Sequence, residues 1–248
     1  MIDHTLREHL KEVAPYPPSV IAVPKPIAGT AFFPGGSGIW QGEGVSNPPR
    51  DPVGGIMILG HDFHSEEGYE RSFQLGGERL TDPTWRNLLL LLREAEISLS
   101  DCFFTNFYMG LRKGTATTGV FPGAKDKAFV ARCQSFFLKQ LEVQRPKVIL
   151  TLGGHVPSLI APLAPQLDVW KGVKKLKDID AKEAAVVHGV QFGEALPRVT
   201  VAALTHPSLR HANVGRREYQ GEHGHPAERR MLSAVQARST DHRLNPKE

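Results

Sequence analysis

A carboxylate lies between two imidazoles in the segment GHDFHS, residues 60–65. A carboxylate beside histidines can position a water molecule as a general base. The same side chains can ligate a metal ion, because His61 and His64 bracket Asp62, or they can cap the turn that follows. The segment comes after an apolar run that ends in glycine, which predicts a buried strand. The sequence therefore predicts a chemically competent group at a strand end.

A second polar cluster, THPSLRH at residues 205–211, follows another apolar run and includes His206. The Pro-Ser after this histidine fixes a rigid turn, which can hold the imidazole in a defined place. The chain has no H-E-x-x-H zinc motif and no G-x-S-x-G nucleophile elbow. A metal-dependent hydrolase therefore stays open as an alternative, whereas a Ser-His-Asp hydrolase has no motif to support it. The candidate metal ligands are His61, Asp62, His64, His206, His223 and His225.

Apolar runs alternate with amphipathic segments over most of the chain. The runs that predict strands are residues 54–60, 102–106, 147–154 and 199–206. The segments that predict helices are residues 2–13, 85–95, 126–143, 156–163 and 226–237. This alternation predicts an α/β fold with three layers, α/β/α, around a central four-stranded parallel sheet. In such sheets the ligand site lies beyond the carboxyl ends of the strands, which is where both polar clusters fall.

The organisation that we expect is a single domain with an N-terminal extension. Residues 1–53 form the extension, a short helix followed by Pro- and Gly-rich sequence that packs on the core, and residues 54–248 form the main domain. A lysine-rich insertion at residues 165–198 interrupts the alternation. It contains KGVKKLKDIDAK, with five lysines and two aspartates, and then AAVVHGVQF, which reads as a hairpin strand. A solvated surface loop and a DNA-contacting loop are both open for it.

Composition is ordinary for a soluble globular protein, with 248 residues, 40% hydrophobic and 23% charged. The net charge of +4 is compatible with a polyanionic partner but does not require one. Cys102 and Cys133 are too few for a disulfide scaffold or a four-thiolate metal site. No signal peptide and no apolar run of membrane-spanning length is present. We therefore expect a cytoplasmic monomer with no membrane partner and no cofactor.

Four short motifs follow one another at the predicted strand ends. The first is GHDFHSEEGYERSFQLG at residues 60–76, and the second is Thr105-Asn106. The third is PKVILTLG at residues 146–153, and the fourth runs from His206 to Arg210. In this order and spacing the chain resembles the uracil-DNA glycosylase superfamily, with a layout closest to its iron-sulfur-containing family 4. The resemblance covers residues 54–237 except for the lysine-rich insertion.

The resemblance implies hydrolysis of the bond that joins uracil, or a related deaminated base, to the DNA sugar. The base would be flipped out of the stack. Asp62, with His61 beside it, would orient the attacking water, and His206 would donate a hydrogen bond to the departing base. Phe73 would stack on the base, and the amide of Asn106 would bind its Watson–Crick edge. The other residues of the implied base pocket are Gly60, Phe63 and His64.

The turn after the second histidine is implied to contact DNA. Leu209 would act as a wedge in the gap that the flipped base leaves, and Arg210 would bind the flanking phosphate. The alternative is that Leu209 lies in the core and Arg210 caps the closing helix. The implied DNA-contacting residues are Ser208, Leu209, Arg210, His211, Arg216 and Arg217.

The chain also departs from the family pattern. His61 stands where family 4 has its acid, and Asp62 matches the carboxylate of family 1, which has Gly-Gln-Asp-Pro-Tyr. Phe63 replaces a proline, and His64 stands where family 1 has a tyrosine that excludes thymine. Most cysteine ligands of the iron-sulfur cluster are missing, so we predict no cluster and no required metal. A catalytically silent DNA-binding member, or one that traps DNA covalently through a histidine, is the main alternative.

Overall fold

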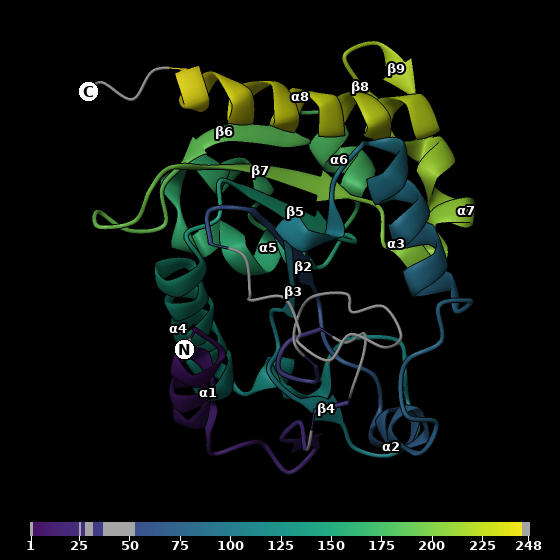
Figure 1. The fold of residues 1–248 in the computed structure, drawn as a ribbon, viewed down its shortest axis with the longest axis vertical. Helices are drawn as coiled ribbons and strands as arrows, with labels where there is room; N and C mark the ends of the chain where they lie inside the picture. The colour runs from purple at the N-terminus through teal and green to yellow at the C-terminus, as the bar shows by residue number, and fades with distance from the viewer. Residues whose placement is uncertain (1, 25, 28–31, 37–52, 245–248) are drawn as a thin grey trace. The chain divides into compact units, whose positions relative to one another are not determined.

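The computed structural model describes residues 2–24, 26–27, 32–36 and 53–244 of the chain (Figure 1). The chain divides into two compact units. The first unit consists of Met1–Gly54, Ile58–Arg79 and Leu99–Arg145, and the second of Gly55–Met57, Leu80–Ser98 and Pro146–Glu248. The expected organisation, an extension at residues 1–53 and a main domain at residues 54–248, stays a prediction.

One sheet has five strands, is mostly parallel, and has the order β3-β2-β5-β7-β6. Its strands are β2 (Ile56–Gly60), β3 (Cys102–Asn106), β5 (Val148–Leu152), β6 (Val186–Val190) and β7 (Val199–Leu204). The four predicted strands are present, and the α/β class is confirmed. The predicted number of strands was wrong by one, because β6, from the lysine-rich insertion, pairs antiparallel with β7.

The first unit contains three α-helices within its described residues: α1 (Ile2–Leu10), α2 (Glu66–Gln74) and α4 (Lys127–Gln144). Two short strands, β1 (Val20–Ile21) and β4 (Leu111–Arg112), pair antiparallel. The side chain of Ser65 accepts a hydrogen bond from the backbone N–H of Gly68 at 3.3 Å and so caps α2. Asp126 caps α4 in the same way, and α1 packs against α4.

Part of the predicted N-terminal extension lies along β3. The backbone N–H of Phe33 donates to the carbonyl of Phe104 at 2.8 Å, and the Phe33 ring is fully buried. The phenol of Tyr69 donates to the carbonyl of Gly35 at 3.2 Å, which joins this segment to α2. Residues 37–52 of the extension lie outside the described residues. The segment 32–36 therefore belongs to the surroundings of the β3 strand end.

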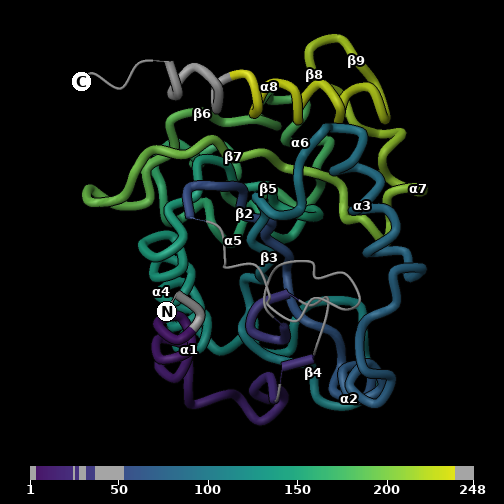
Figure 2. The backbone as a smooth tube through the Cα atoms, in the orientation of Figure 1, coloured from purple at the N-terminus to yellow at the C-terminus, as the bar shows by residue number. Residues whose placement is uncertain are grey.

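The second unit is built around β5, β7 and β6. Every residue of β5 and β7 is buried, as in a sheet that is covered on both faces. Helix α8 (His225–Leu244) packs against β7 and β6, and the chain trace in Figure 2 shows it running beside these strands. The other elements are α3 (Pro83–Glu94), α5 (Val156–Ile160), α6 (Leu176–Asp180), α7 (Arg210–Asn213) and the β8–β9 hairpin (Glu218–Tyr219 and Glu222–His223).

In the part of the chain that the structure describes, no helix combines the length and the apolar character needed to cross a membrane. Cys102 and Cys133 are both free and buried. Burial raises the pKa of each thiol to about 12, so both stay protonated at neutral pH.

Candidate active site

The carboxylate of Asp62 is held by two partners, Arg112 and His61, just after β2. Arg112, from β4, donates from Nε to Oδ1 and from Nη2 to Oδ2, both at 2.9 Å. His61 contributes Nδ1, which lies 2.5 Å from Oδ2. The parallel pair of bonds from a guanidinium to both carboxylate oxygens fixes the plane as well as the position of the carboxylate. Asp62 is therefore rigidly oriented, with a side chain that is only 10% exposed.

These contacts set the charge of Asp62. Burial raises the pKa of this carboxyl group, but the hydrogen bonds and charges of His61 and Arg112 outweigh burial and bring the pKa below its ordinary value. The group is thus a carboxylate at neutral pH. A carboxylate accepts about four hydrogen bonds, and three of these positions are filled by described residues. One acceptor position is left, on Oδ1, and it can hold a water molecule.

Arg112 is a site residue that the sequence did not reveal. Its side chain is 4% exposed and lies over the ring of Phe121, 5.6 Å from the ring centroid. Its Nη1 and Nη2 also donate to three backbone carbonyls of the next loop, those of Thr118, Gly119 and Val120. Arg112 therefore connects Asp62 to the loop at residues 118–120. The only signal in the sequence is an arginine inside a short apolar segment, 50 residues from its partner.

An amide and an aromatic ring converge on Gly60, two residues before Asp62. A Cβ atom at Gly60 would lie 2.1 Å from Oδ1 of Asn106 and 3.7 Å from Cε1 of Phe32. Only glycine leaves room for the Asn106 amide, whereas the Phe32 ring would be at ordinary van der Waals distance. The β3 strand end is held beside β2, since the N–H of Phe107 donates to the carbonyl of Gly60 at 2.9 Å. Phe32 and Asn106 therefore meet at the same strand end.

Asn106 is 5% exposed, and its side chain makes no hydrogen bond to the residues that the structure describes. Its amide atoms are not among the described polar atoms that are fully buried without a partner, so they stay accessible to a ligand. The amide offers both a donor and an acceptor. This combination suits a polar ligand that presents the complementary pair of groups, as the edge of a pyrimidine does.

Three other predicted pocket residues lie elsewhere in the first unit. Phe63 is 8% exposed, in the core. His64 is exposed, and its Nδ1 accepts the N–H of Ser65 at 2.9 Å at the start of α2. Phe73 is 45% exposed near the other end of α2, about 12 Å along the helix axis from Ser65. No described contact brings Phe73 to Gly60, and the ring that lies beside Asn106 is that of Phe32.

In the second unit, His206 follows β7 and begins the turn Pro207–Leu209. Its Nδ1 accepts the backbone N–H of Ser208 at 3.3 Å and lies 2.9 Å from the Ser208 hydroxyl. A neutral imidazole that accepts at Nδ1 has its proton on Nε2, which is then a donor. Gly153, at the end of β5, lies against this histidine, since a Cβ there would be 3.1 Å from Cβ of His206.

One buried carboxylate, that of Glu228 on α8, binds both ends of the His206 turn. Its Oε1 accepts the N–H of Thr205 at 2.7 Å, and its Oε2 accepts from Nε of Arg210 at 3.0 Å. Nη1 of Arg217 also donates to Oε1, at 3.2 Å. Arg217 in turn donates to both carboxylate oxygens of Asp180, at 2.8 and 2.9 Å. The turn is thus clamped by a network of two arginines and two carboxylates.

This network corrects the expected DNA contacts. Arg210 is 4% exposed and Arg217 is 2% exposed, so neither guanidinium is at the surface. The prediction that they bind phosphates from the surface was wrong, because buried carboxylates bind them instead, and Arg210 does contact the closing helix. Leu209 is 54% exposed. The other members of the predicted surface, Ser208, His211 and Arg216, are partly or fully exposed.

The geometry does not favour the metal-dependent alternative. No group of three or more His, Cys, Asp and Glu side chains in the described parts of the chain is arranged to hold a metal ion. Asp62 has most of its acceptor positions filled by hydrogen-bond donors, two of them from the Arg112 guanidinium, and these donors compete with a metal ion. His223 is 70% exposed on the β8–β9 hairpin, 4.0 Å from Glu218.

No known protein-family model matches this chain, and a search of curated proteins finds no similar sequence.

Proposed function

We propose that this protein is a DNA glycosylase that removes uracil, or a related deaminated base, from DNA. The observation that carries the proposal is the convergence of Phe32 and Asn106 over Gly60, two residues before the ionised carboxylate of Asp62. Within the described ranges no side chain or backbone group pairs with the Asn106 amide. A ring, a donor–acceptor amide and a fixed carboxylate are the groups needed to stack on a flipped base, read its edge and orient a water molecule.

The chemical step is hydrolysis of the C1′–N glycosidic bond. The base stacks on Phe32, and the amide of Asn106 pairs with its Watson–Crick edge. The open acceptor position on Oδ1 of Asp62 orients a water molecule, which adds its hydroxyl to C1′ while the base leaves with the bonding electrons. The proton of that water passes to the Asp62 carboxylate and from there to solvent, which supplies the proton that the base takes up. Nε2–H of His206 stabilises the negative charge on the base oxygen, and the base then takes up a proton. The role of His206 rests on the match of its His-Pro-Ser motif.

The resemblance to the glycosylase superfamily also bears on the fold, the oligomeric state and the location of this protein. The glycosylase superfamily has a three-layer α/β/α arrangement, and we propose it for this chain as well. We also propose that the protein works as a monomer in the cytoplasm, on single- or double-stranded DNA, without a cofactor. Neither Asp62 nor His206 needs a metal ion for the steps assigned to them.

The test is release of free base from labelled oligonucleotides that contain uracil, hypoxanthine, xanthine or a mismatched thymine. We expect uracil release and an alkali-labile abasic site, and His206→Ala should lower the rate by about 10²-fold or more. No base release from any substrate would contradict the proposal. A protein–DNA adduct that survives denaturation would instead indicate the covalently trapping alternative.

Phe32 and Phe73 provide a matched pair for the stacking assignment. We expect Phe32→Leu to raise KM and lower kcat/KM for uracil by roughly tenfold, because base–aromatic stacking contributes about 1–3 kcal/mol per base. Phe73→Leu should change neither by more than about twofold. The opposite ranking in steady-state kinetics would return the stacking role to Phe73.

A further inference from the structure

The lysine-rich segment at residues 171–182 contains three lysines without partners. Lys174, Lys175 and Lys177 are exposed and have no ion pair or side-chain hydrogen bond with the part of the chain that the structure describes. The other two lysines of the segment have partners. Lys171 forms an ion pair with Asp168, and Lys182 donates a hydrogen bond to the carbonyl of Val169. The unpaired positive charge of the segment is therefore concentrated at residues 174–177.

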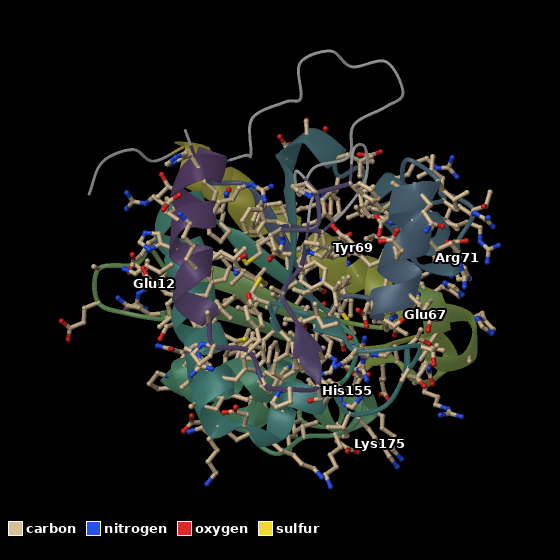
Figure 3. The ribbon with its side chains drawn as sticks, turned by 90° about the horizontal axis from the view of Figure 1, so that it is seen from below. Glu12, Glu67, Tyr69, Arg71, His155 and Lys175 are labelled. Carbon is tan, nitrogen blue, oxygen red and sulfur yellow. The ribbon has the colours of Figure 1, made fainter. Side chains whose placement is uncertain are left out.

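Backbone packing brings these lysines next to the His206 turn. A Cβ at Gly153 would lie 3.1 Å from Cβ of His206, and a Cβ at Gly154 would lie 3.1 Å from the carbonyl of Lys174. Two consecutive glycines at the end of β5 thus touch the turn on one side and the lysine segment on the other. Figure 3 shows His155 and Lys175 near one another at the same edge of the view.

Local carboxylates do not cancel this charge. Asp178 is exposed on α6, but Asp180 is buried and bound by Arg217. The lysines at 174, 175 and 177 therefore outnumber the one exposed carboxylate in residues 174–180. Lysine side chains bind phosphate as point charges on flexible stems, which suits a backbone contact that does not depend on sequence.

We propose that Lys174, Lys175 and Lys177 form a phosphate-binding surface that holds the DNA backbone beside the His206 turn. This surface takes over the role that the buried Arg210 and Arg217 cannot have. The inference rests on the proposed function for the identity of the partner, DNA, whereas the surface itself follows from the exposed lysines and the two glycine contacts.

The experiment measures binding to an oligonucleotide without any damaged base, so that it does not depend on turnover. Fluorescence anisotropy compares the binding of the parent with that of the triple variant Lys174→Gln, Lys175→Gln, Lys177→Gln. The salt concentration is varied over roughly 50–200 mM KCl, a range in which binding that releases counterions weakens strongly. The matched control is Lys125→Gln, Lys127→Gln, Lys147→Gln, three exposed lysines whose loss changes the net charge equally. Melting temperatures of all three proteins serve as the folding control.

We expect the patch variant to raise Kd roughly tenfold at low salt and to reduce the slope of log K against log salt by about 2, as for two lost phosphate contacts. The control variant should retain the parental slope. Parental binding by the patch variant, or equal losses in both variants, would overturn the proposal. Anionic lipid vesicles bound as tightly as DNA, with the same lysine dependence, would also overturn it. A reduced salt slope in the patch variant, together with a parent protein that releases no base, would support this surface while contradicting the proposed function.

Discussion

Asp62 in the first unit and His206 in the second are held in opposite ways. The charged partner of Asp62, Arg112, binds both of its carboxylate oxygens. Near His206, the Glu228 carboxylate binds neighbouring residues: it accepts hydrogen bonds from the N–H of Thr205 and from the side chain of Arg210. The first arrangement fixes the charge and orientation of a side chain. The second fixes a backbone turn, and the imidazole is oriented by the N–H of Ser208 within that turn.

The difference has an energetic consequence. Removing one member of a buried ion pair leaves its partner charged and buried, which costs about 3–5 kcal/mol. Asp62 belongs to such a pair, so its contributions to stability and to chemistry are coupled. The network that clamps the His206 turn binds Thr205 and Arg210, so a stability cost at this turn falls on Glu228.

The largest effect is expected for Asp62→Asn. Turnover of uracil DNA should fall by about 10²-fold or more, and the free energy of unfolding should fall by about 3–5 kcal/mol because Arg112 loses its counter-charge. His206→Ala is the control that separates the two effects, with a similar loss of turnover and a change in unfolding below about 1 kcal/mol. Urea denaturation and single-turnover rates measure both. A parental melting temperature for Asp62→Asn would break the comparison.

Glu228→Gln should be destabilising with a smaller effect on turnover. The amide oxygen can still accept the N–H of Thr205, but Arg210 and Arg217 lose a buried counter-charge, so we expect a loss of about 3–5 kcal/mol in unfolding free energy. Turnover at low temperature should fall by roughly tenfold, through displacement of the turn. Glu222→Gln, on the exposed β9 strand, is the matched control. If Glu228→Gln unfolds like the control, the clamp does not stabilise the turn.

Arg112→Lys tests the charge state of Asp62. Lysine keeps the positive charge but loses the two-pronged contact, so the pKa of Asp62 should rise toward its ordinary value or above it. The carboxylate then protonates at higher pH, and the acid limb of the kcat/KM profile moves upward. The lowered pKa stabilises the folded state above the unfolded pKa, and this contribution is lost as the pH falls through the folded pKa. In Arg112→Lys this contribution to stability should be lost at a higher pH than in the parent. Arg86→Lys, at an exposed position, is the control and should keep the parental pH dependence.

The smallest effect is expected for Leu209→Ala, on the surface of the clamped turn. We expect the rate on duplex substrate to fall by roughly three- to tenfold, with no change on single strands, where no stack has to open. Stability should change by less than about 0.5 kcal/mol, as for other exposed side chains. Leu75→Ala is a close control, because Leu75 is 55% exposed and Leu209 is 54% exposed. Equal losses on both substrates would rule out a wedge.

The strands were the most predictable part of the fold. Every residue of β5 and β7 is buried, so each leaves a continuous apolar run in the sequence. Strand β6 is different, because His188 and Gly189 interrupt its apolar pattern and its register shifts between Val187 and Val190. The sequence therefore indicated a strand there without its place in the sheet.

The site was predictable only where the strand ends themselves supply it. Asp62, Asn106 and His206 each follow an apolar run closely, and topology alone places such residues at strand ends. Arg112 and Phe32 reach the site through contacts between segments far apart in the chain, which no local pattern encodes. Arginine is also usually exposed, so the burial of Arg210 and Arg217 becomes visible only with their carboxylate partners.

Gly153 and Gly154 have a consequence for how this protein can evolve. One dipeptide touches both the turn proposed for chemistry and the segment proposed for DNA contact. Gly153 has φ +88°, a conformation that L side chains rarely adopt, so any replacement strains the backbone and presses on His206. A methyl group at Gly154 would instead press on the carbonyl of Lys174. Substitutions at Gly153 would thus act on the reaction rate through His206, and substitutions at Gly154 on the affinity for DNA through the lysine segment. Selection can therefore change one of these two properties without a loss of the other.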